Sequence, residues 1–285
     1  MRRNVLNSPR LTELKKKRRR AVSYKIFISL FGFSVIFALL AYLSHLDNLN
    51  IAEIQVSGNK VVETEMIKAE TKRIISGKHL WLFPKTNILY YPQGTIEDSL
   101  REKFKRIKEI NMSVKNDKTL EMVLEEREGK YIWCGAKPEA EKEKCYFADE
   151  SGYIFDEAPY FSGEVYFKLY GLGEPAVENP LGSYFLQANF AQLMSFKDIL
   201  GDFGMKPVAL YHNQNGDLEF FLTKGKSASI RPKIILKADA DFQNVAENLK
   251  AALNTEPLLS KFKNKYSSLL YIDLRFGNKV VYKFQ

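Results

Sequence analysis

Two cysteines and three histidines are the residues of this 285-residue chain with the most distinctive chemistry. Cys134 and Cys145 each lie on an apolar stretch at the neck of a polar loop, in KYIWCGAKPEAEKEKCYFADE. Two thiols in this arrangement could form a disulfide, stay reduced or contribute to a metal site. A metal site is disfavoured, because no histidine or further cysteine stands near them to complete four ligands.

The histidines give no indication of a catalytic centre. His45, His79 and His212 are far apart in the sequence, and their spacing matches neither a ligand set nor a triad. No G-x-S-x-G, H-E-x-x-H or glycine-rich dinucleotide motif occurs. The sequence therefore predicts a protein without enzymatic activity, cofactor or small-molecule substrate. The alternative is an anchored envelope enzyme whose polar residues converge only in the fold.

The redox state of the cysteines depends on the compartment, which the N-terminal region indicates. Residues 26–46, IFISLFGFSVIFALLAYLSHL, contain no Asp, Glu, Lys or Arg. As a helix they would extend about 30 Å, the hydrocarbon thickness of a bilayer, so they predict a transmembrane helix. A cleaved signal peptide is the alternative, but such peptides have shorter apolar cores and a small-residue cleavage site, which LSHL at residues 43–46 does not provide.

The charge distribution predicts the orientation of that helix. Residues 1–25 hold ten of the 43 Lys and Arg residues and one of the 34 acidic residues, so the other 260 residues carry 33 charges of each sign. The net charge of +9 therefore belongs to the tail, and no nucleic-acid-binding face is indicated. The positive-inside rule places this tail in the cytoplasm, where it can also contact anionic lipid, and the remaining residues outside. A basic amphipathic or nucleic-acid-binding role for the tail is the alternative.

Outside the cytoplasm, Cys134 and Cys145 are expected to form a disulfide, with two reduced thiols as the alternative.

Residues 50–127 predict a domain with the order β-α-α-β-β, starting directly after the span. The expected elements are a strand at 51–56, a helix that begins with Thr64 as N-cap and ends at Gly77, a helix at 94–107, and strands at 109–116 and 118–127. In the second helix, Ile96, Leu100, Phe104 and Ile107 have the spacing of one helical face.

Three stretches of this region resemble the POTRA domain of bacterial division proteins of the FtsQ/DivIB family. They are IQVSGNKVV, GKHLWLFPKTNI and FKRIKEINMSVKNDKTLEMVLEER. The chain departs from the family pattern at Glu128-Gly129, where a Pro-x-Ala step is common. The resemblance implies an α+β protein with one transmembrane helix, an extracytoplasmic POTRA domain and a second domain.

Residues 128–285 predict that second domain, of mixed α/β type with a largely antiparallel sheet. The pattern indicates two strands around the cysteine loop, a hairpin at 149–155, a helix at 185–204, a hairpin turning at Asn215-Gly216, a strand at 234–237, a helix at 241–254 and a closing hairpin. The closing YIDLRFGNKVVYKF resembles the terminal Y-x-D-x-R motif of the same family.

The closing hairpin predicts a strand with an open edge. A three-residue loop, Gly277–Lys279, would place the apolar side chains of both strands on one face. It would pair Phe276 with Val280, Leu274 with Tyr282 and Ile272 with Phe284. Such an edge could be an ordinary one, kept soluble by Lys279 and Lys283, or one left open for a partner's strand.

The family resemblance implies what that partner would be. In the family, the FtsB component of an FtsB/FtsL coiled coil docks on a surface that includes the terminal hairpin. By position, the implied binding residues are Phe276, Gly277, Asn278, Val280, Val281 and Tyr282. The implied function is a scaffold of the division machinery in the plasma (inner) membrane, at the division septum. The alternative, an envelope transport or assembly adaptor, would predict several POTRA repeats.

Overall fold

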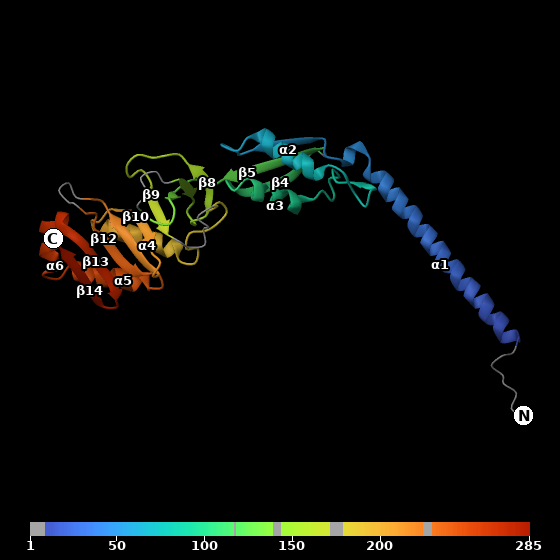
Figure 1. Cartoon of the computed structure of the whole chain (residues 1–285). Coiled ribbons are helices and arrows are strands. Elements are labelled where there is room, and N and C mark those ends of the chain that lie inside the picture. Colours follow the sequence, from blue (N-terminus) through green and yellow to red (C-terminus); the bar gives the residue numbers. More distant parts are fainter. Residues whose placement is uncertain (1–8, 117, 139–143, 172–178, 225–229) are drawn as a thin grey trace, which may run out of the picture. The chain divides into compact units, whose positions relative to one another are not determined.

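The computed structural model describes residues 9–116, 118–138, 144–171, 179–224 and 230–285 (Figure 1). It is an α+β structure, as the sequence predicts. Its residues form two compact units. The first unit comprises the chain up to Lys103 together with Glu109–Glu125, and the second comprises Phe104–Lys108 together with Glu126–Gln285.

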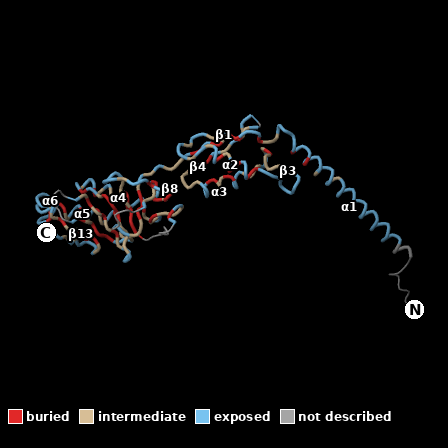
Figure 2. Tube along the Cα trace, turned by 45° about the horizontal axis from the view of Figure 1, so that its top comes forward, coloured by how far each residue is buried: buried red, intermediate tan, exposed pale blue. Residues whose placement is uncertain are grey.

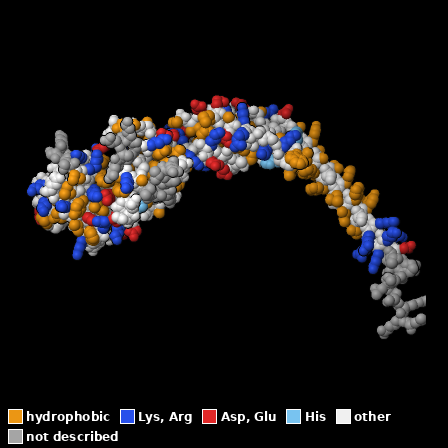
Figure 3. Space-filling view, in the orientation of Figure 1, with side chains coloured by type: hydrophobic (Ala, Val, Ile, Leu, Met, Phe, Trp, Pro, Cys, Tyr) orange, Lys and Arg blue, Asp and Glu red, His pale blue; other side chains and the backbone are white. Residues whose placement is uncertain are grey.

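The first unit begins with helix α1, Pro9–Ser44, which is long and apolar enough to cross a membrane. Most of its length is exposed, and apolar side chains cover it after the basic residues near its start (Figures 2 and 3). The helix ends two residues before the predicted span does, and the short 3-10 helix η2, Asp47–Leu49, follows. Asn50 satisfies carbonyl groups left at this helix end, because its Nδ2 donates to Ser44 O and Leu46 O.

A small sheet and two helices complete the first unit. Its elements are β1 (Glu53–Ser57), α2 (Thr64–Ile75), β2 (Lys78–His79), β3 (Phe83–Pro84), α3 (Gln93–Lys103), β4 (Ile107–Lys115) and β5 (Thr119–Glu126). The three-stranded sheet has the order β1-β5-β4, with β1 and β5 parallel, and β2 pairs with β3 in a separate hairpin. Alternate residues of β5 are buried (Leu120, Met122 and Leu124), which gives this strand one apolar face.

Two details of these helices correct the sequence-based expectation. Glu63, not Thr64, occupies the N-cap of α2, and the Thr64 hydroxyl instead accepts a hydrogen bond from Asn59 Nδ2. Helix α3 ends at Lys103 and does not extend to Ile107 as predicted. Ile107 continues the helical spacing in the sequence, but in the structure it is the first residue of β4 and is buried there. Helical spacing alone did not separate the two roles.

The buried carboxylate of Glu70 links α2 to α3. It accepts hydrogen bonds from Arg73 in its own helix and from Ser99 and Lys103 in α3. These hydrogen bonds, that from Arg73 first, lower the pKa of Glu70 to about 2. Glu70 therefore remains ionised at neutral pH and holds α2 against α3 through its hydrogen bonds.

In its described residues, the second unit contains a nine-stranded sheet and three α-helices. The sheet has the order β14-β13-β12-β11-β10-β9-β6-β7-β8. The strands are β6 (Tyr131–Trp133), β7 (Cys145–Ala148), β8 (Ile154–Ala158), β9 (Phe167–Gly171), β10 (Pro207–His212), β11 (Asp217–Leu222), β12 (Lys233–Lys237), β13 (Leu269–Phe276) and β14 (Lys279–Phe284). The helices are α4 (Phe190–Asp202), α5 (Phe242–Leu253) and α6 (Leu258–Lys265), followed by the 3-10 helix η3 (Tyr266–Ser268).

The sheet is mixed, with five antiparallel and three parallel neighbouring pairs. In two of the parallel pairs, the two strands are consecutive along the chain and are separated only by helices. Helix α4 lies between β9 and β10, and α5 and α6 lie between β12 and β13. Parallel strands need such crossovers, and the crossovers supply the helices that cover the sheet.

The main core of this unit lies between the sheet and the helices. Alternate residues of β11 point into it (Leu218, Phe220 and Leu222), and they meet apolar residues of α4, including Leu193, Phe196 and Leu200. A second, smaller cluster includes residues of β6, β8, β9 and β10 (Ile132, Ala158, Tyr170 and Ala209) together with Cys134. The prediction of a helix at 185–204 was correct in type, but α4 begins at Phe190.

Candidate partner-binding edge

Strand β14 lies at one end of the nine-stranded sheet and carries three of the six predicted binding residues, Val280, Val281 and Tyr282. It pairs with β13 on one side, and in the part of the chain that the structure describes no strand pairs with its other side. We call this outer side of Lys279–Phe284 the β14 edge. Such an edge presents unpaired N–H and C=O groups that can pair with another chain.

The loop of this hairpin corrects the predicted register. Phe276 pairs with Lys279, so the loop has two residues, Gly277 and Asn278, and not three. Gly277 has φ +63°, whereas Asn278 does not have a positive φ, which is the pattern of a type II′ turn. Phe276 and Lys279 are consequently both exposed at the tip.

Two bulges in β13 restore the apolar face that the three-residue loop was expected to create. Between Asp273 and Phe276, β13 advances by three residues while β14 advances by two, and a second shift follows near Leu269. Ile272 therefore lies opposite Tyr282, not opposite Phe284 as predicted. Alternation of residue types could not distinguish a longer loop from a bulge, because both put the same side chains inside.

The direction of the backbone groups in β14 follows from a hydrogen bond just beyond the strand. Gln285 N donates to Ser268 O at 2.8 Å, so this N–H points toward β13. Because N–H groups alternate along a strand and the extra residues lie in β13, those of Val281 and Lys283 point the same way. The N–H groups of Val280 and Tyr282 then point outward, at the β14 edge.

The side chains of β14 separate into two sets. Val280, Tyr282 and Phe284 are half-buried and pack on the main core, so they fix the strand against the helices. On the opposite face, Val281 is 42% exposed between Lys279 and Lys283, and Phe276 is 56% exposed at the tip. A strand added at the β14 edge would thus lie next to the exposed Val281, with the exposed Phe276 one strand further away, at the end of β13.

An ion network stabilises the bulged end of β13. Arg275 donates to both carboxylate oxygens of Asp273, at 2.9 and 2.6 Å, and to Asp217 of β11 at 2.7 Å. Burial by itself would raise the pKa of Asp273, but the hydrogen bonds from Arg275 outweigh it and hold this pKa below its ordinary value. Arg275 therefore has a structural role, because it links Asp273 of β13 to Asp217 of β11 across β12.

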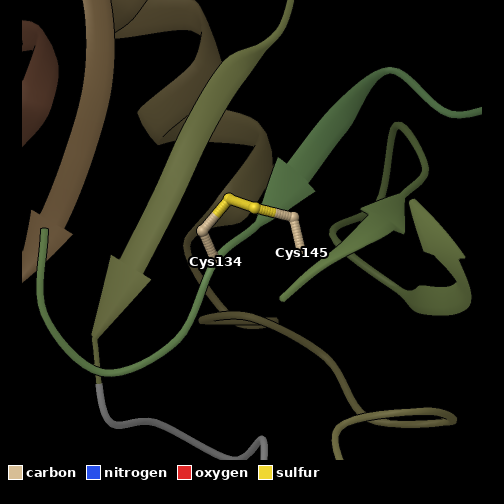
Figure 4. Close-up of a disulfide and its surroundings, with 2 residues drawn as sticks. All are labelled: Cys134 and Cys145. Atoms are coloured by element: carbon tan, nitrogen blue, oxygen red, sulfur yellow. A yellow bond between two sulfur atoms is a disulfide. The ribbon is translucent and has the colours of Figure 1, made fainter. Parts of the chain in front are cut away.

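The two cysteines lie in another part of the second unit. Their sulfur atoms are 2.07 Å apart, in a disulfide that joins the residue after β6 to the first residue of β7 (Figure 4). Cys134 is buried, and its N–H donates to Leu169 O of β9. The disulfide thus closes the neck of the cysteine loop, whose residues 139–143 lie outside the described part of the chain.

The histidines are placed on separate elements. His45 follows α1, His79 lies in β2 and His212 lies in β10. In the described residues, no group of three or more His, Cys, Asp or Glu side chains is arranged to hold a metal ion. The side chain of Asp149 stabilises a turn, because its Oδ1 accepts hydrogen bonds from the N–H groups of Ser151 and Tyr153.

Comparison with protein-family models and with curated proteins found no match for this chain.

Proposed function

We propose that this chain is a membrane-anchored, non-enzymatic scaffold of the bacterial cell division machinery, of the FtsQ/DivIB type. In this proposal the first unit is a POTRA domain and the second is the partner-binding β domain. The order β1-α2-α3-β4-β5 and the three sequence stretches within it support the POTRA assignment. The terminal YIDLRFGNKVVYKF supports the assignment of the second unit.

The β14 edge is the observation on which the proposed function rests. The outward N–H groups of Val280 and Tyr282 can bond a strand of the FtsB component of an FtsB/FtsL-type coiled coil, by β-augmentation. Backbone hydrogen bonds then supply affinity. Val281, which is exposed next to the edge, and Phe276, which is exposed at the end of β13, supply selectivity.

Helix α1 anchors the scaffold in the plasma (inner) membrane. Its basic start stays in the cytoplasm by the positive-inside rule, and the part of the first unit after α1 lies outside together with the second unit. The disulfide between Cys134 and Cys145 supports this orientation, because disulfides persist in oxidising compartments.

A fluorescent fusion in dividing cells of the organism that encodes the chain tests the proposed function. The fusion should form a band at midcell, and variants of the β14 edge should still form a membrane-bound protein that fails to retain the FtsB-type partner. A uniform membrane signal through the whole division cycle would contradict a role in division.

A reporter enzyme that is active only outside the cytoplasm tests the orientation. Fused after Gln285, it should be active in the intact cell. Activity only of a cytoplasmic reporter at the same position would contradict the orientation but would leave the β14 edge as a binding site.

A further inference from the structure

The turn between β2 and β3 displays apolar side chains to solvent in the first unit. Leu80 is 78% exposed and Trp81 is 92% exposed, and Leu82 beside them is also exposed. Adjacent exposed residues of this size are uncommon on a soluble surface and indicate a site of interaction. We call these three residues the apolar turn.

The backbone of the apolar turn holds these side chains outward. Leu80 has φ +47° and Trp81 has φ +62°, a left-handed region that residues with a Cβ rarely adopt. Leu82 N donates to His79 O at 3.1 Å, and the pairs Lys78–Pro84 and His79–Phe83 close the hairpin beneath the turn. The exposure is therefore a property of a defined hairpin.

The base of this hairpin is tied to the end of α1. Asn87 Nδ2 donates to Ser44 O at 3.2 Å. The segment after β3 also pairs with the segment after α1, through Ile51 N to Thr86 O at 2.8 Å and Ile88 N to Leu49 O at 3.0 Å. These bonds fix where the hairpin begins relative to the helix.

The hairpin also contacts the helix well before its end. The ring of Phe83 meets that of Phe37 edge to face, with centroids 5.3 Å apart. Phe37, Ala41 and Ser44 have the spacing of one helical face, and all three are at least half-buried. Phe37 lies seven residues before Ser44, which corresponds to about 10 Å along the helix axis.

This depth places the apolar turn at the level of the outer membrane–water interface. The sequence pattern alone predicts the span at residues 26–46, but β3 and the segment after it contact Phe37 and Ser44, so we place the lipid-crossing segment closer to the basic run. About 20 helical residues cross the hydrocarbon, so a span that starts at Ala21 ends near Leu40. Lys25 can extend its ammonium group back to the interface. Phe37 then lies just inside the outer boundary, and a hairpin that reaches Phe37 reaches lipid.

We propose that the apolar turn inserts into the outer interface of the bilayer that α1 crosses. The inference rests on the proposed membrane anchoring by α1. Trp81 suits this position, because tryptophan favours the interface, and the exposed Lys78 at the start of the hairpin can contact lipid phosphate. The helix and the turn together give the first unit two attachments to the bilayer, which restrict its rotation about the helix axis.

Tryptophan fluorescence tests the insertion directly, because the chain has only two tryptophans. Trp133 is 1% exposed, and its Nε1 has no hydrogen-bond partner among the described residues, so Trp133→Phe removes no bond. The full chain with this substitution is reconstituted in vesicles of phosphatidylcholine and phosphatidylglycerol. Lipids brominated near the head group should quench at least half of the Trp81 emission, and aqueous iodide should quench it several-fold less than it quenches free tryptophan.

Two reporters in the double variant Trp81→Phe/Trp133→Phe serve as controls. Phe33→Trp, at an exposed position of α1, should be quenched by brominated lipid if the helix spans the bilayer. Tyr160→Trp, at an exposed position of the second unit, should be open to iodide and insensitive to brominated lipid. Circular dichroism of each variant establishes that it is folded.

Each other outcome overturns the insertion. If the Phe33→Trp reporter is quenched by lipid but Trp81 is not, the anchor holds and the insertion is wrong. If neither is quenched, the anchor fails and the insertion fails with it. Protection of Trp81 from iodide without quenching by lipid would mean that protein, and not lipid, covers the turn. Equal lipid quenching at Tyr160→Trp would show that the signal is not specific to the turn.

Discussion

The two end strands of the nine-stranded sheet, β8 and β14, differ in whether their outward backbone groups are hydrogen-bonded. At β8, Ile154 N donates to Ser183 O at 2.9 Å and Gly182 N donates to Ile154 O at 2.8 Å, so a later segment pairs with the outward side of the first residue of the strand. Asp156 in the same strand is paired with Arg106 at 2.6 Å. Backbone pairing and a charged side chain together make β8 a poor template for another strand.

At β14, the backbone pairing is absent among the described residues, because no described segment pairs with the outward side of the strand. Its charged residues, Lys279 and Lys283, are exposed on one face of the strand. The exposed Val281 lies between them. In the described part of the chain, a segment outside the sheet therefore pairs with the outward side of β8 but not with that of β14. Partner binding at β14 is the proposal that accounts for the difference.

The largest expected effect comes from removing an outward donor at the β14 edge. Val280→Pro deletes one N–H that faces the incoming strand and places a ring in its path. We expect binding of the FtsB-type partner to weaken about 100-fold or more, or about 2.7 kcal/mol. Titration calorimetry with the purified partner segment measures this, and circular dichroism establishes that the variant is folded.

A conservative substitution at the same site separates the backbone from the side chain. Val280→Thr keeps the N–H and nearly the same shape, so it should bind the partner within a few-fold of the unsubstituted chain. If Val280→Pro and Tyr282→Pro are both folded and both bind normally, the β14 edge is not the docking site.

The next effect concerns the half of the sheet with the closed edge, which also holds the disulfide. Replacing Cys134 and Cys145 by serine removes a cross-link over a short loop, and the chain-entropy model gives a loss of about 2–3 kcal/mol in the free energy of unfolding. Urea unfolding of the second unit should show this loss, whereas partner binding at β14 should change little below the transition. Mass spectrometry of alkylated, unreduced protein should find neither cysteine labelled in the parent chain.

A smaller loss in the free energy of unfolding is expected when the ion network beside β14 is removed. Arg275→Met leaves the buried Asp273 carboxylate without its main donor, so the free energy of unfolding should fall by about 2 kcal/mol at pH 7. Lys233→Met, which removes the neighbouring pair with Glu219, is the matched control. Lys233→Met should lower the free energy of unfolding by less, because Lys233 makes one bond to Glu219 whereas Arg275 makes several bonds.

The pair of Asp273 and Arg275 also predicts a pH dependence of stability. The pKa of Asp273 is lowered in the folded chain from an ordinary value of 3.8, so its contribution to stability is complete above that value. The contribution is lost as the pH falls from 3.8 toward the lowered pKa. The difference in urea midpoint between the parent chain and Arg275→Met should therefore shrink below about pH 4. A difference that stays constant to pH 2 would show that Arg275 acts through packing and not through charge.

The sequence predicted element types better than it predicted how the edges are formed. The alternation in YIDLRFGNKVVYKF was sufficient for the closing hairpin, because residue type follows burial on each face. The bulges were not predictable in this way, since they accompany contacts between Arg275 and residues in two strands. Closure of β8 was equally hidden, because its backbone bonds join residues some 30 positions apart without any side-chain signature.

Elements with a weak pattern were missed altogether. Helix α6 has one buried residue, Leu258, and β9 is a five-residue strand in which Leu169, Tyr170 and Gly171 are buried in succession, with no alternation to mark it. The exposure of Trp81 was also not predicted, because an aromatic residue in an apolar stretch is more often buried. The periodicity of local sequence indicates the element type, but which apolar residues stay exposed to solvent depends on tertiary contacts that local sequence does not show.

The smallest expected effect is a proline at the closed edge, which serves as the counterpart of Val280→Pro. Glu157 in β8 donates its N–H to the Asp156 carboxylate at 2.8 Å, so Glu157→Pro removes this local bond. Its exposed pair with Lys144 contributes little. We expect a loss of up to about 1 kcal/mol in the free energy of unfolding. Partner binding should remain within about twofold of the parent chain, measured by the same calorimetry. If Glu157→Pro weakens binding as much as Val280→Pro does, proline acts through the sheet as a whole, and the two edges do not differ in the way that their hydrogen bonds indicate.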